Sequence, residues 1–323
     1  MALSRLPSVP QAALRRSLGL AGRVRLTLGF GHIPLATLQR RYEKPASRYL
    51  VIDGTRVHYT DEGEGPALVL LHGVMASLHT WDGWVDALAG HFRIIRVDLP
   101  GFGLTGPLAS GEYTPEYALT FIEQFRRQLG LERFHLAGNS LGGFLSWFYA
   151  VHHPERVERL VLLDPIAYSQ PLPPLIALVS APGMHVISRH VAPRPLVRRG
   201  IREVYGDLAR MRPGTDSRYA DLLMRPGNKA GMVAYFRLLA DMNRDNRFAA
   251  RVRELRVPTL LLWGARDRWV PPALVRRWQQ DVPGLTVKVY PDAGHIPMEE
   301  IPEASAQDAL DFLLMREAKV AAA

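Results

Sequence analysis

Short, largely apolar runs that alternate with longer helical stretches constrain the fold of this chain more than any other feature. Residues 67–71, 93–97 and 160–163 have the length of strands and lack the strict polar alternation of half-exposed ones. Such runs are typical of strands that are buried on both faces of a parallel sheet. Residues 116–129 and 141–151 lie among them and have helical length. The sequence therefore predicts an α/β fold, a mostly parallel sheet with helices on both faces.

Eight strands are expected in all. Two β-rich runs around Asp53-Gly54-Thr55 indicate a hairpin at the start. The helix over residues 116–129 is expected to follow Thr114 as its N-cap and Pro115 as its first residue. The eight expected strands are residues 49–52, 56–59, 67–71, 93–97, 134–137, 160–163, 259–264 and 286–290.

Between the sixth and seventh strands the alternation is interrupted. Residues 165–256 contain repeated prolines and then arginine-rich helical segments. We expect this insertion to form a helical cap. The core then consists of residues 48–164 and 257–323, and residues 1–47 form a basic N-terminal extension.

Positive charge is concentrated outside the expected core. The chain has a formal net charge of +9, and the extension contributes eight basic residues and one acidic residue. The insertion contributes sixteen basic and seven acidic residues, which leaves the core acidic. Basic segments suit an anionic membrane surface, an acidic partner or an anionic substrate, although they also increase solubility. No nucleic-acid-binding module is visible, so nucleic acid is not an expected partner.

The N-terminal extension does not resemble a membrane-spanning or secretory segment. Its longest stretch without charge, residues 27–39, is shorter than the roughly 20 apolar residues that a spanning helix needs. It also lacks a clean apolar core and a small-residue cleavage site. We therefore expect a cytoplasmic protein, with peripheral membrane association through the extension as a hypothesis. The alternative is that the extension packs on the body of the protein.

One short motif indicates a catalytic serine. Residues Gly138-Asn139-Ser140-Leu141-Gly142 read G-N-S-L-G and follow the expected strand at 134–137. This pattern is typical of a serine on a sharp strand-to-helix turn, where flanking glycines relieve steric clashes. By itself the motif is a modest signal, because glycine-rich loops are common. The absence of cysteine excludes a cysteine nucleophile, thiolate metal sites and disulfides.

Five motifs in order resemble the α/β-hydrolase fold over about residues 48–318. The turn with the nucleophilic serine at 138–142 is one of them. Chain order Ser, then Asp, then His is also the order used by this family. The other four are Leu71-His72-Gly73-Val74, Asp98-Leu99-Pro100-Gly101-Phe102-Gly103, Trp263-Gly264-Ala265-Arg266-Asp267 and Asp292-Ala293-Gly294-His295.

The resemblance implies roles for individual residues. Ser140 corresponds to the nucleophile, His295 to its base and Asp267 to the acid that orients the histidine. Asp164, which ends the sixth strand, is the rival for the acid, and Asp267 is preferred from its motif. The backbone N–H groups of Val74 and Leu141 would form the oxyanion hole, and no metal or cofactor is expected.

Nearby residues are ranked lower. His72 is expected to shape its turn rather than to catalyse. Apolar residues close to the motifs could line an acyl pocket, but core packing is the stronger interpretation for each taken singly. These residues are Met75, Trp81, Trp84, Phe144 and Trp147.

The first functional hypothesis is a carboxylesterase or lipase that forms an acyl-enzyme and acts on a small-molecule ester or lipid. The alternative is a carbon–carbon bond hydrolase of the meta-cleavage-product type, since G-N-S-x-G-G also occurs there; a cofactor-free perhydrolase is a further one. A serine nucleophile argues against haloalkane dehalogenase and epoxide hydrolase chemistry, which uses aspartate in this fold. A non-catalytic ligand-binding protein on the same scaffold is the alternative from another class. Acyl length, stereochemical preference and oligomeric state do not follow from the sequence.

Overall fold

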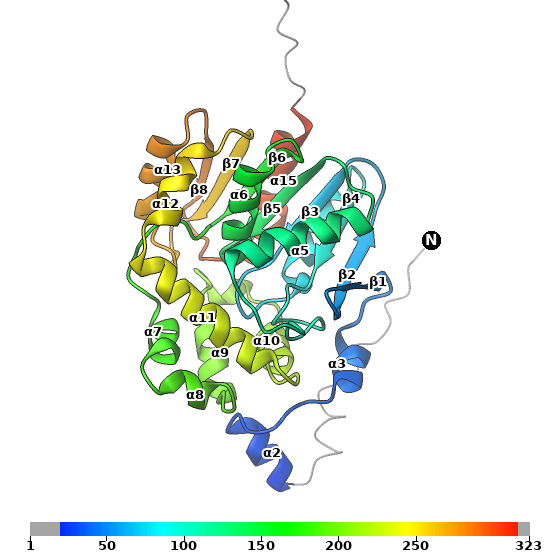
Figure 1. Cartoon of the computed structure of the whole chain (residues 1–323), viewed down its shortest axis with the longest axis vertical. Coiled ribbons are helices and arrows are strands. Elements are labelled where there is room, and N and C mark those ends of the chain that lie inside the picture. The colour runs from blue at the N-terminus through cyan, green and yellow to red at the C-terminus, as the bar shows by residue number, and fades with distance from the viewer. Residues whose placement is uncertain (1–19, 316–323) are drawn as a thin grey trace, which may run out of the picture.

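An eight-stranded sheet lies at the centre of residues 20–315, the part of the chain that the computed structural model describes (Figure 1). Its strand order is β1-β2-β4-β3-β5-β6-β7-β8. β2 runs antiparallel to β1 and β4, and all other neighbours are parallel. The strands are β1 (Ser47–Ile52), β2 (Thr55–Glu62), β3 (Ala67–Leu71), β4 (Arg93–Val97), β5 (Phe134–Asn139), β6 (Val157–Leu163), β7 (Thr259–Gly264) and β8 (Thr286–Tyr290).

The sheet confirms the fold class expected from the sequence, although several strands are longer than their apolar runs. β2 continues through Asp61 and Glu62 because it pairs with β4 there, where Glu62 lies opposite Ile94. Arg93 at the start of β4 forms an ion pair of 2.8 Å with Asp61. Pairing with a neighbouring strand therefore extends the strands into polar residues that the hydrophobic pattern alone does not indicate.

Helices cover both faces of the sheet. α5 and α6 pack together on one face, and α4 and α15 pack together on the other (Figure 1). Thr114 caps α5 by accepting a hydrogen bond from Tyr117 N–H, with Pro115 as the first helical residue, as the sequence indicated. These helices and their short neighbours are η1 (Leu78–Trp81), α4 (Asp82–Leu88), α5 (Pro115–Gln128), α6 (Leu141–His152), η4 (Pro272–Leu274), α13 (Val275–Asp281), α14 (Pro297–Glu300) and α15 (Pro302–Leu314).

A helical insertion lies between β6 and β7, as expected. In Figure 1 it lies below the sheet, on the side where β5 ends and α6 begins. Ile176, Val197 and Leu239 from this insertion belong to the same buried apolar cluster as the strands. Its helices are α7 (Pro174–Ser180), α8 (Met184–Ser188), α9 (Arg194–Glu203), η2 (Leu208–Arg210), α10 (Thr215–Leu223), α11 (Asn228–Arg244), α12 (Arg247–Arg251) and η3 (Val252–Glu254).

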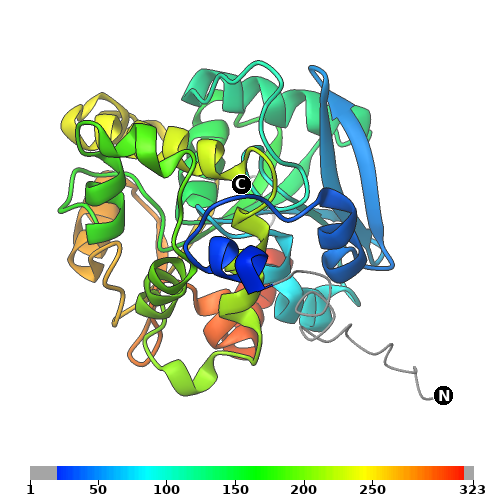
Figure 2. The same cartoon turned by 90° about the horizontal axis from the view of Figure 1, so that it is seen from below.

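The described part of the N-terminal extension packs against the rest of the protein. It forms α2 (Leu20–Thr27) and α3 (Leu35–Tyr42), and seen from below, α2 lies between α3 and the helices of the insertion (Figure 2). Ile33 and Leu38 are buried in a small apolar cluster with Leu222 and Met224. The remainder of the extension, residues 1–19, lies outside the described residues. No helix within residues 20–315 has the length and apolar character needed to cross a membrane.

Candidate active site

The serine turn adopts a strained conformation at the end of β5. Ser140 has φ 55° and ψ −114°, a conformation that non-glycine residues rarely adopt. A side chain at Gly138 would overlap the backbone of Gly142, and one at Gly142 would overlap the carbonyl of Leu71. The glycines of the motif are therefore required by close backbone contacts. They allow the Ser140 side chain to reach the pocket described below.

His295 and Asp267 are joined by a hydrogen bond of 2.7 Å between Nδ1 of the histidine and Oδ2 of the aspartate. The second carboxylate oxygen of Asp267 accepts hydrogen bonds from the N–H groups of Trp269 and Val270. Trp269 also stacks on the imidazole, with ring centroids 6.0 Å apart. These contacts hold Asp267 and His295 in fixed orientations.

Ser140 and His295 line the same pocket. His295 Nε2 is buried and has no hydrogen-bond partner within residues 20–315, and no hydrogen bond joins it to Ser140. Such bonds are often long in unliganded enzymes and shorten when substrate binds. The free Nε2 atom is therefore available to the serine hydroxyl.

The turn between β3 and η1 brings Val74 to the serine. A Cβ atom built on Gly73 would lie 3.1 Å from the Cβ of Ser140, so the two turns are in contact. Val74 lines the pocket beside Ser140 and His295. Leu141 is the first residue of α6, where backbone N–H groups have no partner inside the helix. The N–H groups of both residues form no hydrogen bond within the described chain.

A second buried carboxyl group, that of Asp164, lies against the pair formed by Asp267 and His295. Oxygens of the two carboxyls and a ring nitrogen of His295 lie within 4.8 Å of one another. Asp164 Oδ1 accepts a hydrogen bond from Gly264 N–H, whereas its Oδ2 is buried and has no donor within residues 20–315. Burial and the neighbouring Asp267 carboxylate raise the pKa of Asp164 well above its ordinary value. A protonated Asp164 could satisfy Oδ2 by donating a hydrogen bond to Asp267.

This acidic cluster is a poor cation site. His295 Nδ1 is used in its hydrogen bond to Asp267, so it cannot also coordinate a metal. A raised pKa at Asp164 further reduces the negative charge that a cation would need. The geometry favours a proton-sharing cluster over a metal centre.

Two residues that position this site were not singled out from the sequence. The Asn139 side chain donates hydrogen bonds to the carbonyls of Leu163 and His295, which ties the loop of the histidine to β5 and β6. Glu300 accepts hydrogen bonds from Gly294 beside His295 and from Gly206 and Asp207 in the insertion. The N in G-N-S is the only sequence signal for the first contact. Nothing local in the sequence indicates the second.

The pocket is mostly apolar. Its walls come mostly from the insertion, and no Lys, Arg, Asp or Glu within the described chain lines it. Its polar side chains besides Ser140 and His295 are Tyr168, Gln170 and Asn243. The apolar lining consists of Val74, Ile166, Ala167, Leu172, Pro173, Ile176, Leu239, Met242, Phe248, Trp269 and Val270.

The aromatic and sulfur-containing residues close to the motifs do not form this lining. All five are buried in the main apolar cluster, which agrees with the core-packing interpretation; they are Met75, Trp81, Trp84, Phe144 and Trp147. His72 also has the structural role expected of it, because its ring bonds to the Gly73 carbonyl and accepts from Leu99 N–H. Burial lowers the pKa of His72 and so favours the neutral ring.

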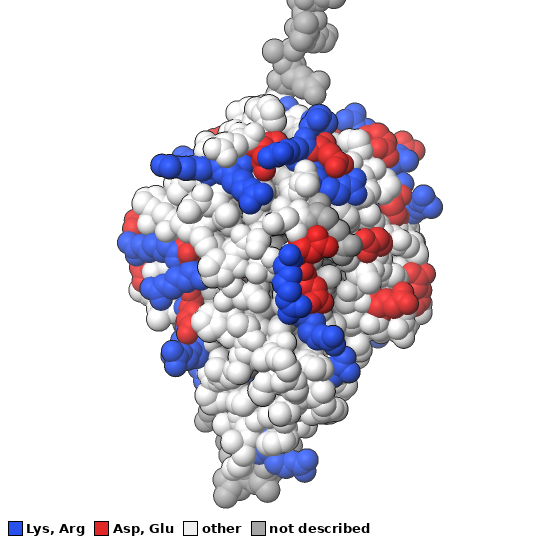
Figure 3. Space-filling view, turned by 60° about the vertical axis from the view of Figure 1, so that its left-hand side comes forward, with Lys and Arg blue, Asp and Glu red and all other residues white. Residues whose placement is uncertain are grey.

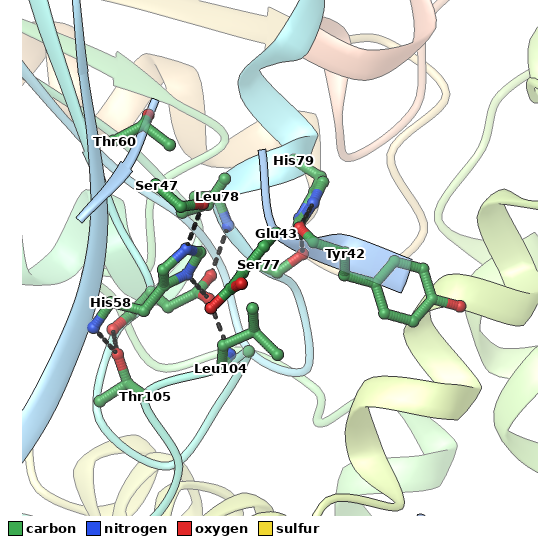
Figure 4. Close-up of polar contacts among 12 residues, drawn as sticks. Tyr42, Glu43, Ser47, His58, Thr60, Ser77, Leu78, His79, Leu104 and Thr105 are labelled. Carbon is green, nitrogen blue, oxygen red and sulfur yellow. Dashed lines mark hydrogen bonds and ion pairs between the residues drawn. The ribbon is translucent and has the colours of Figure 1, made fainter. Parts of the chain in front are cut away.

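A second Ser-His-Asp arrangement is drawn in Figure 4, and none of its residues, Ser47, His58 and Asp98, lines this pocket. His58 bonds to Ser47 Oγ at 2.8 Å and to Asp98 at 2.7 Å. Asp98 also accepts from the N–H groups of Leu78 and Leu104, and Ser47 Oγ accepts from a backbone N–H. Burial opposes ionisation of Asp98, but its hydrogen bond with His58 holds the pKa well below its ordinary range. The cluster therefore joins β1 and β2 to two loops, which gives Asp98 a structural role.

Comparisons with known proteins agree with this architecture. A family model described as alpha/beta hydrolase fold matches residues 66–185 and 199–302. A curated relative, the 2-hydroxy-6-oxononadienedioate/2-hydroxy-6-oxononatrienedioate hydrolase of Paraburkholderia phymatum, is 30% identical over 283 residues, covering 84% of this chain and 96% of that protein. Epoxide hydrolase 3 of Xenopus tropicalis is 27% identical, over 80% of this chain and 75% of that protein.

A solved structure of a membrane phospholipase A, a bacterial virulence factor, is similar over more of the chain. It has a TM-score of 0.69 and 25% identity, and the match covers 94% of this chain and 95% of that one. The similarity therefore extends into the N-terminal extension.

Proposed function

The chain belongs to the α/β-hydrolase fold family, and from this premise we propose that it is a serine hydrolase that cleaves carboxylic esters with apolar acyl chains. In this proposal residues 165–256 act as a cap over a core of residues 48–164 and 257–323. Ser140, His295 and Asp267 form the catalytic triad under that cap. The bond that is cleaved is the part of the proposal that needs testing, because one fold supports many reactions.

The proposed mechanism proceeds through an acyl-enzyme. His295 Nε2 takes the Ser140 proton as the hydroxyl oxygen attacks the ester carbonyl, and Asp267 stabilises the imidazolium that forms. The N–H groups of Val74 and Leu141 would bind the oxyanion; a donor of this kind typically contributes about 3 kcal/mol to the transition state. The intermediate collapses as His295 protonates the departing alcohol. A water molecule, deprotonated by the same histidine, then releases the acid.

The uncharged, apolar pocket is the observation that carries this proposal. A neutral hydrocarbon chain would be buried favourably against such walls. The name of the Paraburkholderia relative denotes a dicarboxylate substrate. Its carboxylates would lose hydration in this pocket without meeting a lysine or arginine of the described chain, which is costly.

The second candidate is a carbon–carbon bond hydrolase. The curated relatives favour it over an ester hydrolase. The P. phymatum relative is an example and matches nearly its whole length. The membrane phospholipase A supports the ester reading, since its name denotes an enzyme that hydrolyses acyl esters of phospholipids. The epoxide hydrolase match does not favour that chemistry here, because Ser140 stands where those enzymes use aspartate.

An activity series separates the two candidates. We expect kcat/KM to rise from p-nitrophenyl acetate to the octanoate, and to exceed turnover of a vinylogous diketone ring-cleavage product. Ser140→Ala should lower ester turnover by about a thousandfold or more. Ser47→Ala is the matched control, because Ser47 has a similar His-Asp partnership outside the pocket. Preferential turnover of the diketone would instead establish the carbon–carbon hydrolase.

A further inference from the structure

Exposed apolar side chains gather at one end of the molecule. Val24 in α2 and Leu28 and Phe30 just after it are 49%, 51% and 44% exposed. Val186 and Ile187 in α8 are 56% and 54% exposed. Monomeric proteins seldom leave so many large apolar side chains together in solvent without a function. We call these five residues the apolar tip.

Hydrogen bonds join the two halves of the apolar tip. The carbonyl of Gly29, between Leu28 and Phe30, accepts from Ala192 N–H and from Lys229 Nζ. The same lysine, which is buried, donates to the carbonyls of Gly31 and His190. In Figure 1, α2 and α8 both lie at the lower end of the molecule. The tip is therefore one surface, built jointly by the N-terminal extension and the insertion.

The same end of the molecule has a basic surface. Residues 20–42 and residues 165–202 contain no Asp or Glu. Arg25 and Arg189 are exposed, and neither forms an ion pair within the described chain. The face in Figure 3 narrows toward this end, where it shows basic and neutral residues and no acidic ones. Protruding apolar side chains beside unpaired arginines suit an anionic lipid surface.

We propose that the apolar tip inserts into the headgroup region of an anionic lipid bilayer while Arg25 and Arg189 contact lipid phosphates. A bilayer fits this convex end better than a folded partner does, because lipid can deform around protruding side chains. The sequence gave membrane association as a hypothesis from the positive charge of the extension and of the insertion. The structure adds exposed apolar side chains on α2 and α8 at one end. The helix that precedes α8, α7, contributes Ile176 to the catalytic pocket. The proposal goes beyond ester hydrolysis and does not depend on it.

Vesicle flotation of the full-length protein tests the proposal. We expect binding to vesicles of 30% phosphatidylglycerol in phosphatidylcholine, weak binding to pure phosphatidylcholine, and a fall in binding as salt rises. Val186→Glu/Ile187→Glu should reduce partitioning at least tenfold. Val51→Glu is the matched control, because Val51 is 58% exposed on β1, remote from the tip. Circular dichroism and thermal unfolding of each variant report whether it is folded.

Three results would overturn the proposal. One is equal partitioning of the wild type and a folded Val186→Glu/Ile187→Glu variant, which would mean that other parts of the chain bind the vesicles. Another is the absence of binding to either vesicle by the wild type. The third is a wild-type dimer that becomes a monomer in the variant without any vesicle binding, which would make the tip a self-association surface.

Discussion

At Ser140 the chain keeps a backbone conformation that typically costs a non-glycine residue about 1–3 kcal/mol. Its N–H donates to the Leu163 carbonyl and its own carbonyl accepts from Ile166 and Phe144. These bonds come from β6, the segment after it and α6, so the turn is held from several sides. The strain is maintained by the surrounding elements, and it keeps the hydroxyl at the pocket.

Asp164 provides a pH-dependent test of the buried carboxyl pair. The pKa of Asp164 is higher in the folded protein than its ordinary value of 3.8, so folding favours the protonated group. The contribution of this group to the free energy of unfolding is therefore fully present below pH 3.8. That contribution is lost as pH rises toward the folded-state pKa. In Asp164→Asn the new side chain has the same shape as aspartate, and its amide NH2 group can donate a hydrogen bond to Asp267. We expect urea unfolding between pH 4 and 8 to show a shallower fall in stability for Asp164→Asn than for the wild type.

The activity of the same variant distinguishes a neutral from an ionised Asp164. If the group is neutral, Asp164→Asn should retain kcat/KM within about tenfold of the wild type, because the amide can still donate to Asp267. Loss of activity comparable to that of a folded Asp267→Asn variant would show that the charge of Asp164 is required.

At the residue scale, motif order selected Ser140, Asp267 and His295. Ser140 and His295 line one pocket, and Asp267 is hydrogen-bonded to His295. Their catalytic roles stay predictions. The sequence could not indicate that Asn139 holds the His295 loop or that Asp164 lies against Asp267. Those contacts join residues far apart in the chain, and only the packed sheet brings them together.

Among the elements, α14 connects the insertion to the loop of His295 through Glu300. In Glu300→Gln, an amide NH2 group replaces one of the two carboxylate oxygens that accept these three hydrogen bonds. An NH2 group cannot accept from a backbone N–H, so at least one buried hydrogen bond is lost. We expect a loss of about 1–3 kcal/mol of unfolding free energy. The value of kcat should also fall as the His295 loop shifts, and urea unfolding and ester kinetics measure the two effects. Glu303→Gln is the control, because Glu303 is exposed on the first turn of α15; equal behaviour of both variants would contradict this role of Glu300.

Lys229 in α11 connects the extension to the insertion. Lys229→Met removes three hydrogen bonds to backbone carbonyls and leaves those carbonyls without this donor. We expect faster amide hydrogen exchange over residues 28–34 with little change in the sheet. Lys288→Met on β8, where the side chain is 55% exposed, should leave that exchange unchanged. Protection of residues 28–34 equal to the wild type would show that Lys229 does not hold the segment.

The regular elements were more predictable than the extension. Buried strands and the capped helix α5 have strong local patterns, and the sequence predicted their number and order. By contrast, α2 and α3 have eight residues each, too short to be stable without tertiary contacts. Their positions depend on Ile33, Leu38 and the Lys229 bonds, which involve distant segments.

For the whole molecule, the sequence showed two basic segments but not that they meet. The extension and the insertion lie more than a hundred residues apart, and the fold places α2 against α9 at one end. The sequence also could not decide which bond is cleaved, because related proteins of this fold act on different substrates. Among the described residues, the pocket wall has no charged side chain, and this is a property of the assembled insertion and sheet.

Labelling with a fluorophosphonate probe tests the central claim, that Ser140 is an activated nucleophile, most directly. Intact-mass and peptide analysis of the folded, full-length protein should show one adduct per chain, on Ser140. The adduct should be absent from Ser140→Ala and retained in Ser47→Ala. A folded wild-type protein that stays unlabelled, or one that is labelled on Ser47 instead, would contradict the account.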